Sequence, residues 1–195
     1  METPDFTLIA ASQSNFKDMP IPQPDFWVFA YGSLIWDPGF EFITSKRATL
    51  TGYHRRLCLW STRYRGSKTK PGLVLGLDIS GSCEGVAYLV SPQHRSQAAK
   101  YLFDREMLNN AYAPMILPLQ LEDGSVVSSL GFVSKIDHPQ YAPPLAFHDM
   151  LKIIKTAAGP RGSNREYVTN TADHLNKLGI RDKQLEKLSK ALYES

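Results

Sequence analysis

Residues 26–36 read FWVFAYGSLIW, and the prediction of the fold begins with this segment. Its first six residues are aromatic, β-branched or small and apolar, which is typical of a buried strand. The strand should end at Gly32-Ser33, and Asp37-Pro38-Gly39 provides a second turn signal. Such a turn can present consecutive backbone N–H groups to an anion. The plainer interpretation is an ordinary strand end with apolar anchors.

The rest of the chain shows blocks of strand and helix patterns. Further strands are predicted over 47–60, 73–79, 84–90, 115–121 and 126–134, and helices over 92–108, 145–157, 164–178 and 181–193. Turn residues predict a kink near Gly52 and hairpin connections at Ser80-Gly81-Ser82 and Asp123-Gly124. Antiparallel strands, one helix, another hairpin and then helices indicate an α+β fold, because a Rossmann sheet would require alternating βαβ units.

The length and composition indicate one ordinary globular domain. The chain has 195 residues, of which 43% are hydrophobic and 21% charged. These values exclude membrane spans, collagen and disorder as the main character of the chain. Residues 1–25 contain four prolines and are predicted to be an extended N-terminal arm. Residues 26–195 are then expected to form a single domain.

Cysteine and histidine usage excludes several kinds of site. Cys58 and Cys83 cannot form a disulfide framework and lack the spacing of metal ligands, so buried, reduced thiols are predicted. The five histidines include no H-x-x-x-H pair, and neither a G-x-G-x-x-G nor a Walker A motif occurs. We therefore predict no metal and no cofactor. Residues 1–25 contain no targeting signal, and the reduced thiols favour a cytoplasmic protein.

A basic stretch lies within this nearly neutral chain, whose formal net charge is only +3. Between residues 40 and 70 a single acidic residue, Glu41, faces eight cations: Lys46, Arg47, Arg55, Arg56, Arg63, Arg65, Lys68 and Lys70. The stretch is consistent with an electropositive binding surface for an anionic ligand, with a nucleic-acid contact surface or with a solvent-exposed strand face. Acidic residues interrupt the basic residues of the C-terminal helices, which argues against nucleic acid as a partner there.

A carboxylate lies on the apolar side of the predicted helix 92–108. On a helical wheel, Glu106 lies on the face that should be buried, with Ala98 and Leu102 on one side and Ala99 and Phe103 on the other. Burial disfavours a carboxylate anion and raises its pKa, which suits a general base near neutral pH. Alternatively, a glutamate at a helix end can fray into solvent or pair with an arginine.

Five blocks of sequence together resemble the ChaC-like γ-glutamylcyclotransferase family. They occur in family order, extend over roughly residues 26–178, and comprise WVFAYGSLIW (27–36), GYHRRLCLWS (52–61), PGLVLGL (71–77), REM (105–107) and GPRGSNREY (159–167). The resemblance implies a small mixed β-barrel flanked by helices. It also implies that the protein cleaves glutathione to 5-oxoproline and cysteinylglycine. The expected partner is therefore this small-molecule substrate, and neither a membrane nor a nucleic acid is expected as a partner. The oligomeric state stays open.

The resemblance also implies the site residues. Glu106 matches the catalytic glutamate, and the substrate-binding positions would be Ala30, Tyr31, Gly32, Ser33, Leu34, Ile35, Tyr112 and Tyr167. The chain departs from the family at Asn109-Asn110, where a glycine is common, and asparagine tolerates the left-handed conformation that this helix exit would need. Two alternatives stay open: a cyclotransferase for other γ-glutamyl amines or peptides, and a non-catalytic binding module of the same fold.

Overall fold

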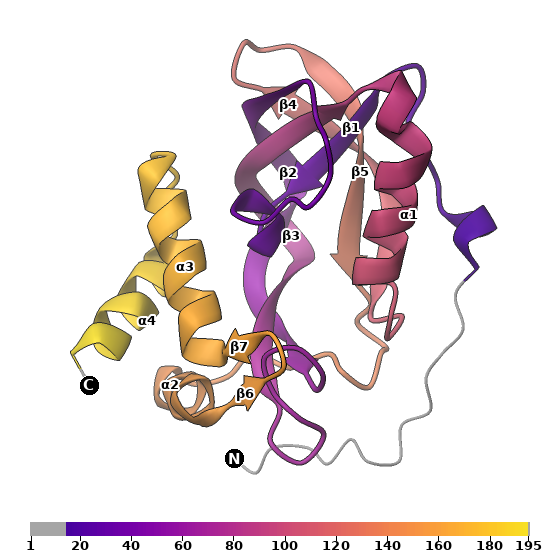
Figure 1. Cartoon of the computed structure of the whole chain (residues 1–195). Helices are drawn as coiled ribbons and strands as arrows, with labels where there is room; N and C mark the ends of the chain where they lie inside the picture. Colours follow the sequence, from indigo (N-terminus) through magenta and orange to yellow (C-terminus); the bar gives the residue numbers. More distant parts are fainter. Residues whose placement is uncertain (1–14, 195) are drawn as a thin grey trace. The chain divides into compact units, whose positions relative to one another are not determined.

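The structure is a computed structural model that describes residues 15–194. These residues form two compact units (Figure 1). The barrel unit comprises residues 15–56 and 76–136, and the helical unit comprises residues 57–75 and 137–194. Residues 1–14 of the predicted arm lie outside the described residues. In the remainder of the arm, Phe16–Asp18 forms a short 3-10 helix, and the Phe16 ring packs 5.5 Å from the ring of Phe103.

Five strands close into a barrel in the order β1-β3-β2-β4-β5, with a further pairing of β3 and β5. Their bounds are β1 Phe26–Ala30, β2 Thr44–Ser61, β3 Gly72–Val90, β4 Tyr112–Leu121 and β5 Val126–Ser134. The barrel is mixed, because β1 runs antiparallel to β3 but parallel to β5. The predicted α+β fold with a small mixed barrel and helices is therefore confirmed.

Strand β1 is buried along its whole length, as its composition predicts. Helix α1, Arg95–Glu106, lies beside it and runs in the same direction. The Arg95 guanidinium lies 6.0 Å from the Phe26 ring at one end, and Arg105 bonds Ser33 just beyond the other end. The buried face of α1 includes the small residues Ala98 and Ala99. A short 3-10 turn, Pro92–His94, precedes the helix within the predicted range.

The predicted hairpin at Ser80-Gly81-Ser82 is wrong, because β3 continues through it as one strand. Ser80 and Gly81 do have positive φ angles, 99° and 70°, so the turn chemistry is present. Those two residues make a local irregularity, while the segments on either side pair with other strands. The Asp123-Gly124 hairpin is confirmed, since β4 and β5 pair in antiparallel register from Tyr112 to Gln120.

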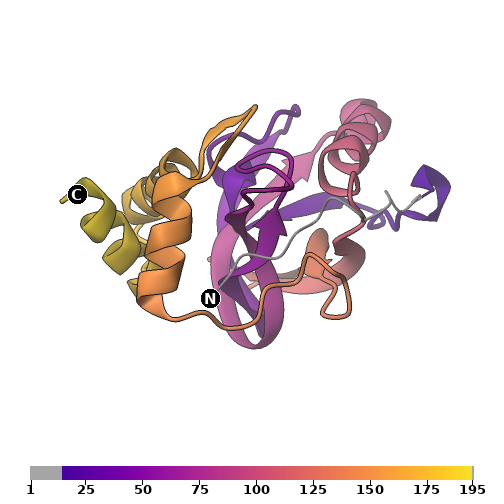
Figure 2. The ribbon, with the colours of Figure 1, turned by 90° about the horizontal axis from the view of Figure 1, so that it is seen from below.

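The helical unit contains α2 Phe147–Thr156, α3 Asn164–Lys177 and α4 Lys183–Tyr193, close to the predicted ranges. The three helices pack against one another (Figures 1 and 2). Side-chain caps begin two of them, because Ser163 accepts from the Glu166 amide and Asp182 from the Leu185 amide. Between α2 and α3, β6 Ala158–Gly159 and β7 Gly162–Ser163 form a small hairpin that was not predicted from the sequence.

Candidate active site

The turn after β1 is built from its own backbone hydrogen bonds. Residues Ser33–Ile35 form a 3-10 turn, in which the Ile35 amide donates to the Gly32 carbonyl at 2.9 Å. The amides of Trp36 and Asp37 donate to the Ser33 carbonyl at 3.2 and 2.8 Å. The amides of residues 32–34 therefore take no part in closing the turn, whereas the predicted binding residue Ile35 uses its amide within it.

Side chains from other strands hold this turn in place. The Arg55 Nε donates to the Tyr31 carbonyl at 2.5 Å, and the Tyr31 hydroxyl donates to the Phe132 carbonyl at 2.7 Å. The Tyr88 hydroxyl donates to the Ile35 carbonyl at 3.1 Å. Burial raises the pKa of Tyr88, so this hydroxyl stays a donor at neutral pH. The turn is thus a fixed piece of backbone and not a loose loop.

Glu106 is the last residue of α1 and faces inward, as the helical wheel predicts. Only 16% of its side chain is exposed. Its Oε1 lies 3.1 Å from the Nε of Arg105. The two interpretations from the sequence are therefore both correct in part, because the carboxylate is largely buried and also paired with an arginine.

Arg105, which was not among the predicted site residues, connects Glu106 to the turn after β1. The residue is buried and its Nη2 donates to the Ser33 Oγ at 2.9 Å. Its Nη1 donates to the Asp37 carbonyl and to the Tyr101 hydroxyl, each at 2.7 Å. The helical wheel contained a signal for this position, because Arg105 lies only about 20° from Ala98 on the apolar face.

The exit from α1 leads directly to Tyr112. Asn110 has a φ of 55°, so the left-handed conformation expected at the Asn-Asn departure is confirmed. Its side-chain oxygen accepts from Lys135 Nζ at 2.6 Å, and the Lys135 amide donates to the Ala111 carbonyl. Tyr112 then starts β4 opposite Ser134. The structure thus places residues 30–35, Glu106 and Tyr112 in the barrel unit.

The remaining predicted site residue, Tyr167, belongs to the helical unit and lies on α3. It is buried, and its hydroxyl accepts from the Leu75 amide at 3.1 Å. The guanidinium of Arg65 lies 5.7 Å from its ring centroid. Arg65 is itself buried and has an exposed partner in Glu166, at 3.4 Å. Burial lowers the pKa of Arg65, partly offset by the nearby Glu166.

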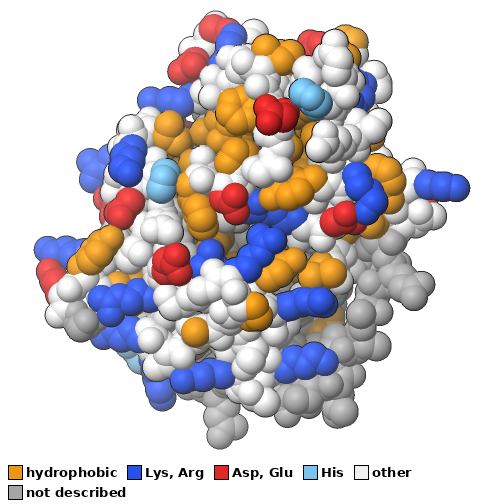
Figure 3. All heavy atoms as spheres, in the orientation of Figure 1, with side chains coloured by type: hydrophobic (Ala, Val, Ile, Leu, Met, Phe, Trp, Pro, Cys, Tyr) orange, Lys and Arg blue, Asp and Glu red, His pale blue; other side chains and the backbone are white. Residues whose placement is uncertain are grey.

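The basic stretch is less electropositive than its sequence indicates. At least half of its eight cations have carboxylate partners, in the pairs Lys46–Asp123, Arg47–Glu84, Arg56–Asp78 and Arg65–Glu166. Figure 3 shows Lys and Arg side chains of one face interspersed with acidic side chains and apolar surface. An attraction for anions would therefore depend on exposed cations of the stretch, such as Arg63, Lys68 and Lys70.

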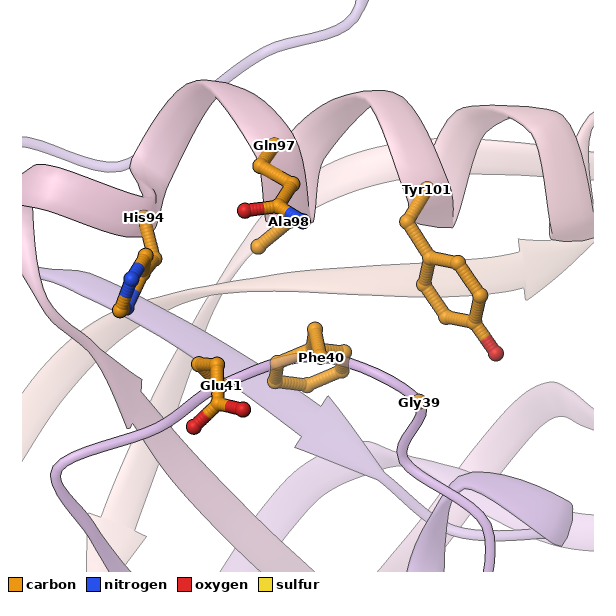
Figure 4. Close-up of a pocket in the computed structure, with 7 residues that line it drawn as sticks. All are labelled: Gly39, Phe40, Glu41, His94, Gln97, Ala98 and Tyr101. Carbon is orange, nitrogen blue, oxygen red and sulfur yellow. The ribbon is translucent and has the colours of Figure 1, made fainter.

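A separate cavity of about 360 Å³ lies in the barrel unit (Figure 4). Its lining residues come from the segment after the turn and from the start of α1: Gly39, Phe40, Glu41, His94, Gln97, Ala98 and Tyr101. None of the predicted substrate-binding residues lines it. Tyr101 is the residue that this cavity shares with the Arg105 network.

Within residues 15–194, no three or more His, Cys, Asp or Glu side chains come together in a way that could hold a metal ion. No helix there is long and apolar enough to cross a membrane. Both cysteines are free and buried, as predicted.

Comparisons with known proteins agree on one family. A family profile described as ChaC-like protein matches residues 26–195. The glutathione-specific gamma-glutamylcyclotransferase of Escherichia coli (strain K12) is 37% identical over 162 residues, covering 83% of this chain and 70% of that protein. The Schizosaccharomyces pombe protein of the same name is 31% identical over 183 residues, covering 84% and 89%. A crystal structure of a yeast gamma-glutamyl cyclotransferase specific to glutathione superposes with a TM-score of 0.79 at 23% identity, covering 87% and 96%, and so shares the fold.

Proposed function

Because the chain belongs to the ChaC-like protein family, we propose that it is a glutathione-specific γ-glutamylcyclotransferase. It would cleave glutathione to 5-oxoproline and cysteinylglycine. The names of the E. coli and S. pombe relatives support this substrate. The observation that carries the proposal is the ion pair of the inward-facing Glu106 with Arg105, together with the hydrogen bond from Arg105 to Ser33 in the turn after β1.

The proposed reaction needs a base and a defined conformation of the substrate. The α-amine of the γ-glutamyl group, once deprotonated, attacks its own γ-carbonyl carbon and closes a five-membered lactam. The C–N bond to cysteine then breaks, and a proton goes to the leaving nitrogen. Because the attack is intramolecular, the protein mainly has to hold a folded-back conformer and move protons.

Glu106 is the proposed general base. Its carboxylate would accept the ammonium proton and return one to the leaving nitrogen. The turn after β1 is the proposed substrate site, comprising Ala30, Tyr31, Gly32, Ser33, Leu34 and Ile35, with Tyr112 and Tyr167 as further contacts. Amides of residues 32–34 are the natural donors to a glutamyl carboxylate or a developing oxyanion, because the turn closes without them. A donor aimed at an oxyanion typically contributes about 3 kcal/mol.

Further proposals concern the domain organisation, the cellular location and the partners of the protein. We propose that residues 26–195 act as one catalytic domain, since the family match spans them without a break. A cytoplasmic location is consistent with two free thiols. The proposed partner is a small γ-glutamyl compound, with no role for nucleic acid or a membrane.

The first prediction concerns Glu106→Gln. In an assay of 5-oxoproline release from glutathione, this substitution should lower kcat by about 10²- to 10⁴-fold, because the amide cannot accept the ammonium proton. Circular dichroism and the melting temperature should stay close to those of the parent. Glu122→Gln removes an exposed carboxylate and serves as the matched control, with unchanged activity expected.

The same assay separates the alternatives. Release of 5-oxoproline from γ-glutamyl-alanine but not from glutathione would replace the proposed substrate by another γ-glutamyl compound. Binding of glutathione without any product would indicate a binding module. Full activity of Glu106→Gln would remove Glu106 from the mechanism.

A further inference from the structure

Arg105 is a buried cation beside the proposed base, and the reaction described above gives it no part. Only 6% of its side chain is exposed. Burying a guanidinium is unfavourable unless its donors are satisfied and its charge is balanced. The partners that satisfy Arg105 therefore indicate what the residue does.

Those partners come from two separate segments of the chain. Ser33 and Asp37 belong to the turn after β1, whereas Tyr101 and Glu106 belong to α1. A guanidinium is planar and carries five N–H donors in fixed directions. One rigid group therefore sets the placement of the Glu106 carboxylate relative to the turn that would bind the substrate.

The charges around Arg105 keep it protonated. Burial lowers its pKa, but Glu106, Tyr101 and Asp37 act in the opposite direction and the net effect is a raised pKa. The Asp37 carboxylate lies 3.5 Å from Nη1 on the side of the turn. Arg105 thus stays a cation at neutral pH.

Tyr101, which lines the cavity shown in Figure 4, accepts a hydrogen bond from the guanidinium through its hydroxyl. A Cβ atom on Gly39 would lie only 2.0 Å from the Tyr101 hydroxyl, so this hydroxyl is confined by the backbone. The Tyr101 ring also packs 6.4 Å from the Phe40 ring. The position of Arg105 is therefore determined by packed neighbours and not only by its two carboxylates.

We propose that Arg105 is a positioning residue that holds the Glu106 carboxylate in register with the Ser33 turn. It acts through those two residues and does not itself contact the substrate. The inference rests on the proposed function for its kinetic part. Displacing a base by about 1 Å from its productive position can lower the rate about 10²-fold, which sets the size of the effect to measure.

The test compares Arg105→Lys and Arg105→Gln with the parent. Lysine keeps the charge but not the planar set of donors. We expect kcat per folded molecule to fall about 10- to 100-fold in Arg105→Lys and at least as far in Arg105→Gln, with KM within about threefold of the parent. Lys100→Gln removes an exposed cation from the same helix and should leave both constants unchanged.

A second readout follows the turn directly. Amide hydrogen exchange of the peptide covering residues 32–37 should be at least about tenfold faster in Arg105→Lys, because the bonds to Ser33 and Asp37 are lost. Near-ultraviolet circular dichroism gives the folded fraction of each variant. If Arg105→Gln fails to fold, Arg105→Lys alone still provides both measurements.

Each contrary result has a definite meaning. A kcat of Arg105→Lys within twofold of the parent would overturn the proposal, since charge alone would then suffice. A KM raised tenfold with unchanged kcat would also overturn it, by making Arg105 a substrate contact. Unchanged protection of residues 32–37 would overturn it whatever the activity. If the parent releases no 5-oxoproline, the proposed function fails, and the exchange measurement still decides the placement of the turn.

Discussion

Tyr88 shows how one buried side chain connects the barrel to the candidate site. Its hydroxyl reaches the Ile35 carbonyl at the end of the turn, and its ring packs 4.7 Å from the ring of Phe42 and 5.9 Å from that of Phe40. Burial raises its pKa because the phenolate would lose its hydration. The folded protein therefore keeps Tyr88 neutral at a pH where the unfolded chain already ionises it.

The second prediction is an alkaline loss of stability that depends on Tyr88. With a folded pKa above the unfolded value near 10, its contribution is complete below pH 10 and is lost as the pH rises through the folded pKa, by about 1.4 kcal/mol per pH unit. Tyr88→Phe should be less stable by about 1 kcal/mol at pH 7, from the lost hydrogen bond. Its deficit should shrink by pH 11 in urea denaturation, whereas Tyr53→Phe serves as the control. A constant deficit would contradict the argument.

At the scale of elements, Asn164 joins the start of α3 to β3. Its side chain is fully buried, accepts from the Leu73 amide and donates to the Leu73 carbonyl, both at 2.7 Å. The pair of bonds engages both backbone polar groups of Leu73, the N–H and the C=O. The helix carrying Tyr167 is thereby attached to the strand that Tyr167 also contacts at Leu75.

The third prediction is that Asn164→Ala lowers the free energy of unfolding by about 2–4 kcal/mol. Both polar groups of Leu73 would be left buried without partners, and each such group costs about 1–3 kcal/mol. Equilibrium urea denaturation measures the change. Asn176→Ala, at an exposed position of the same helix, should change stability by less than about 0.5 kcal/mol. Equal effects of the two substitutions would show that the bonds to Leu73 contribute little.

At the scale of the whole molecule, the effect of the charged residues on an anionic ligand depends on how many of the cations pair with carboxylates. The net charge is +3, and the basic stretch between residues 40 and 70 exceeds it. At least four of those eight cations pair with carboxylates. Lys68 and Lys70, by contrast, are exposed in the loop before β3. They are the part of the stretch best suited to attract an anion such as glutathione.

The fourth prediction concerns this attraction. The kcat/KM for glutathione should fall as NaCl is raised from about 0.01 to 0.5 M, because salt screens steering between exposed charges. Replacing Lys68 and Lys70 together by Gln should lower kcat/KM about two- to fivefold at low salt and hardly at high salt. Replacing Lys177 and Lys183, which lie elsewhere on the surface, is the control. The same loss at every salt concentration would point to direct contact in place of steering.

Local patterns in the sequence were sufficient for much of the architecture. The buried strand at 26–30, the Asp123-Gly124 hairpin, the left-handed Asn110 and the inward face of Glu106 all agree with predictions from the residues. Each depends on interactions within a few positions along the chain, such as a helical period or a turn conformation. Such interactions are readable from neighbouring residues without knowledge of what packs against them.

Other features depended on which distant segments became neighbours. Ser80-Gly81 has the chemistry of a hairpin turn, yet the segments around it pair with β1 and β5 and make one continuous strand. The helical wheel places Arg105 on the apolar face but does not reveal its role, because its partner Ser33 lies 72 residues away. Turn propensity is weaker than the combined pairing and burial of a barrel, and a buried cation is explained only by the groups that surround it. The sequence therefore specified most of the helices and strands and the inward orientation of the Glu106 carboxylate. Tertiary packing decided which strands pair and which residues hold that carboxylate.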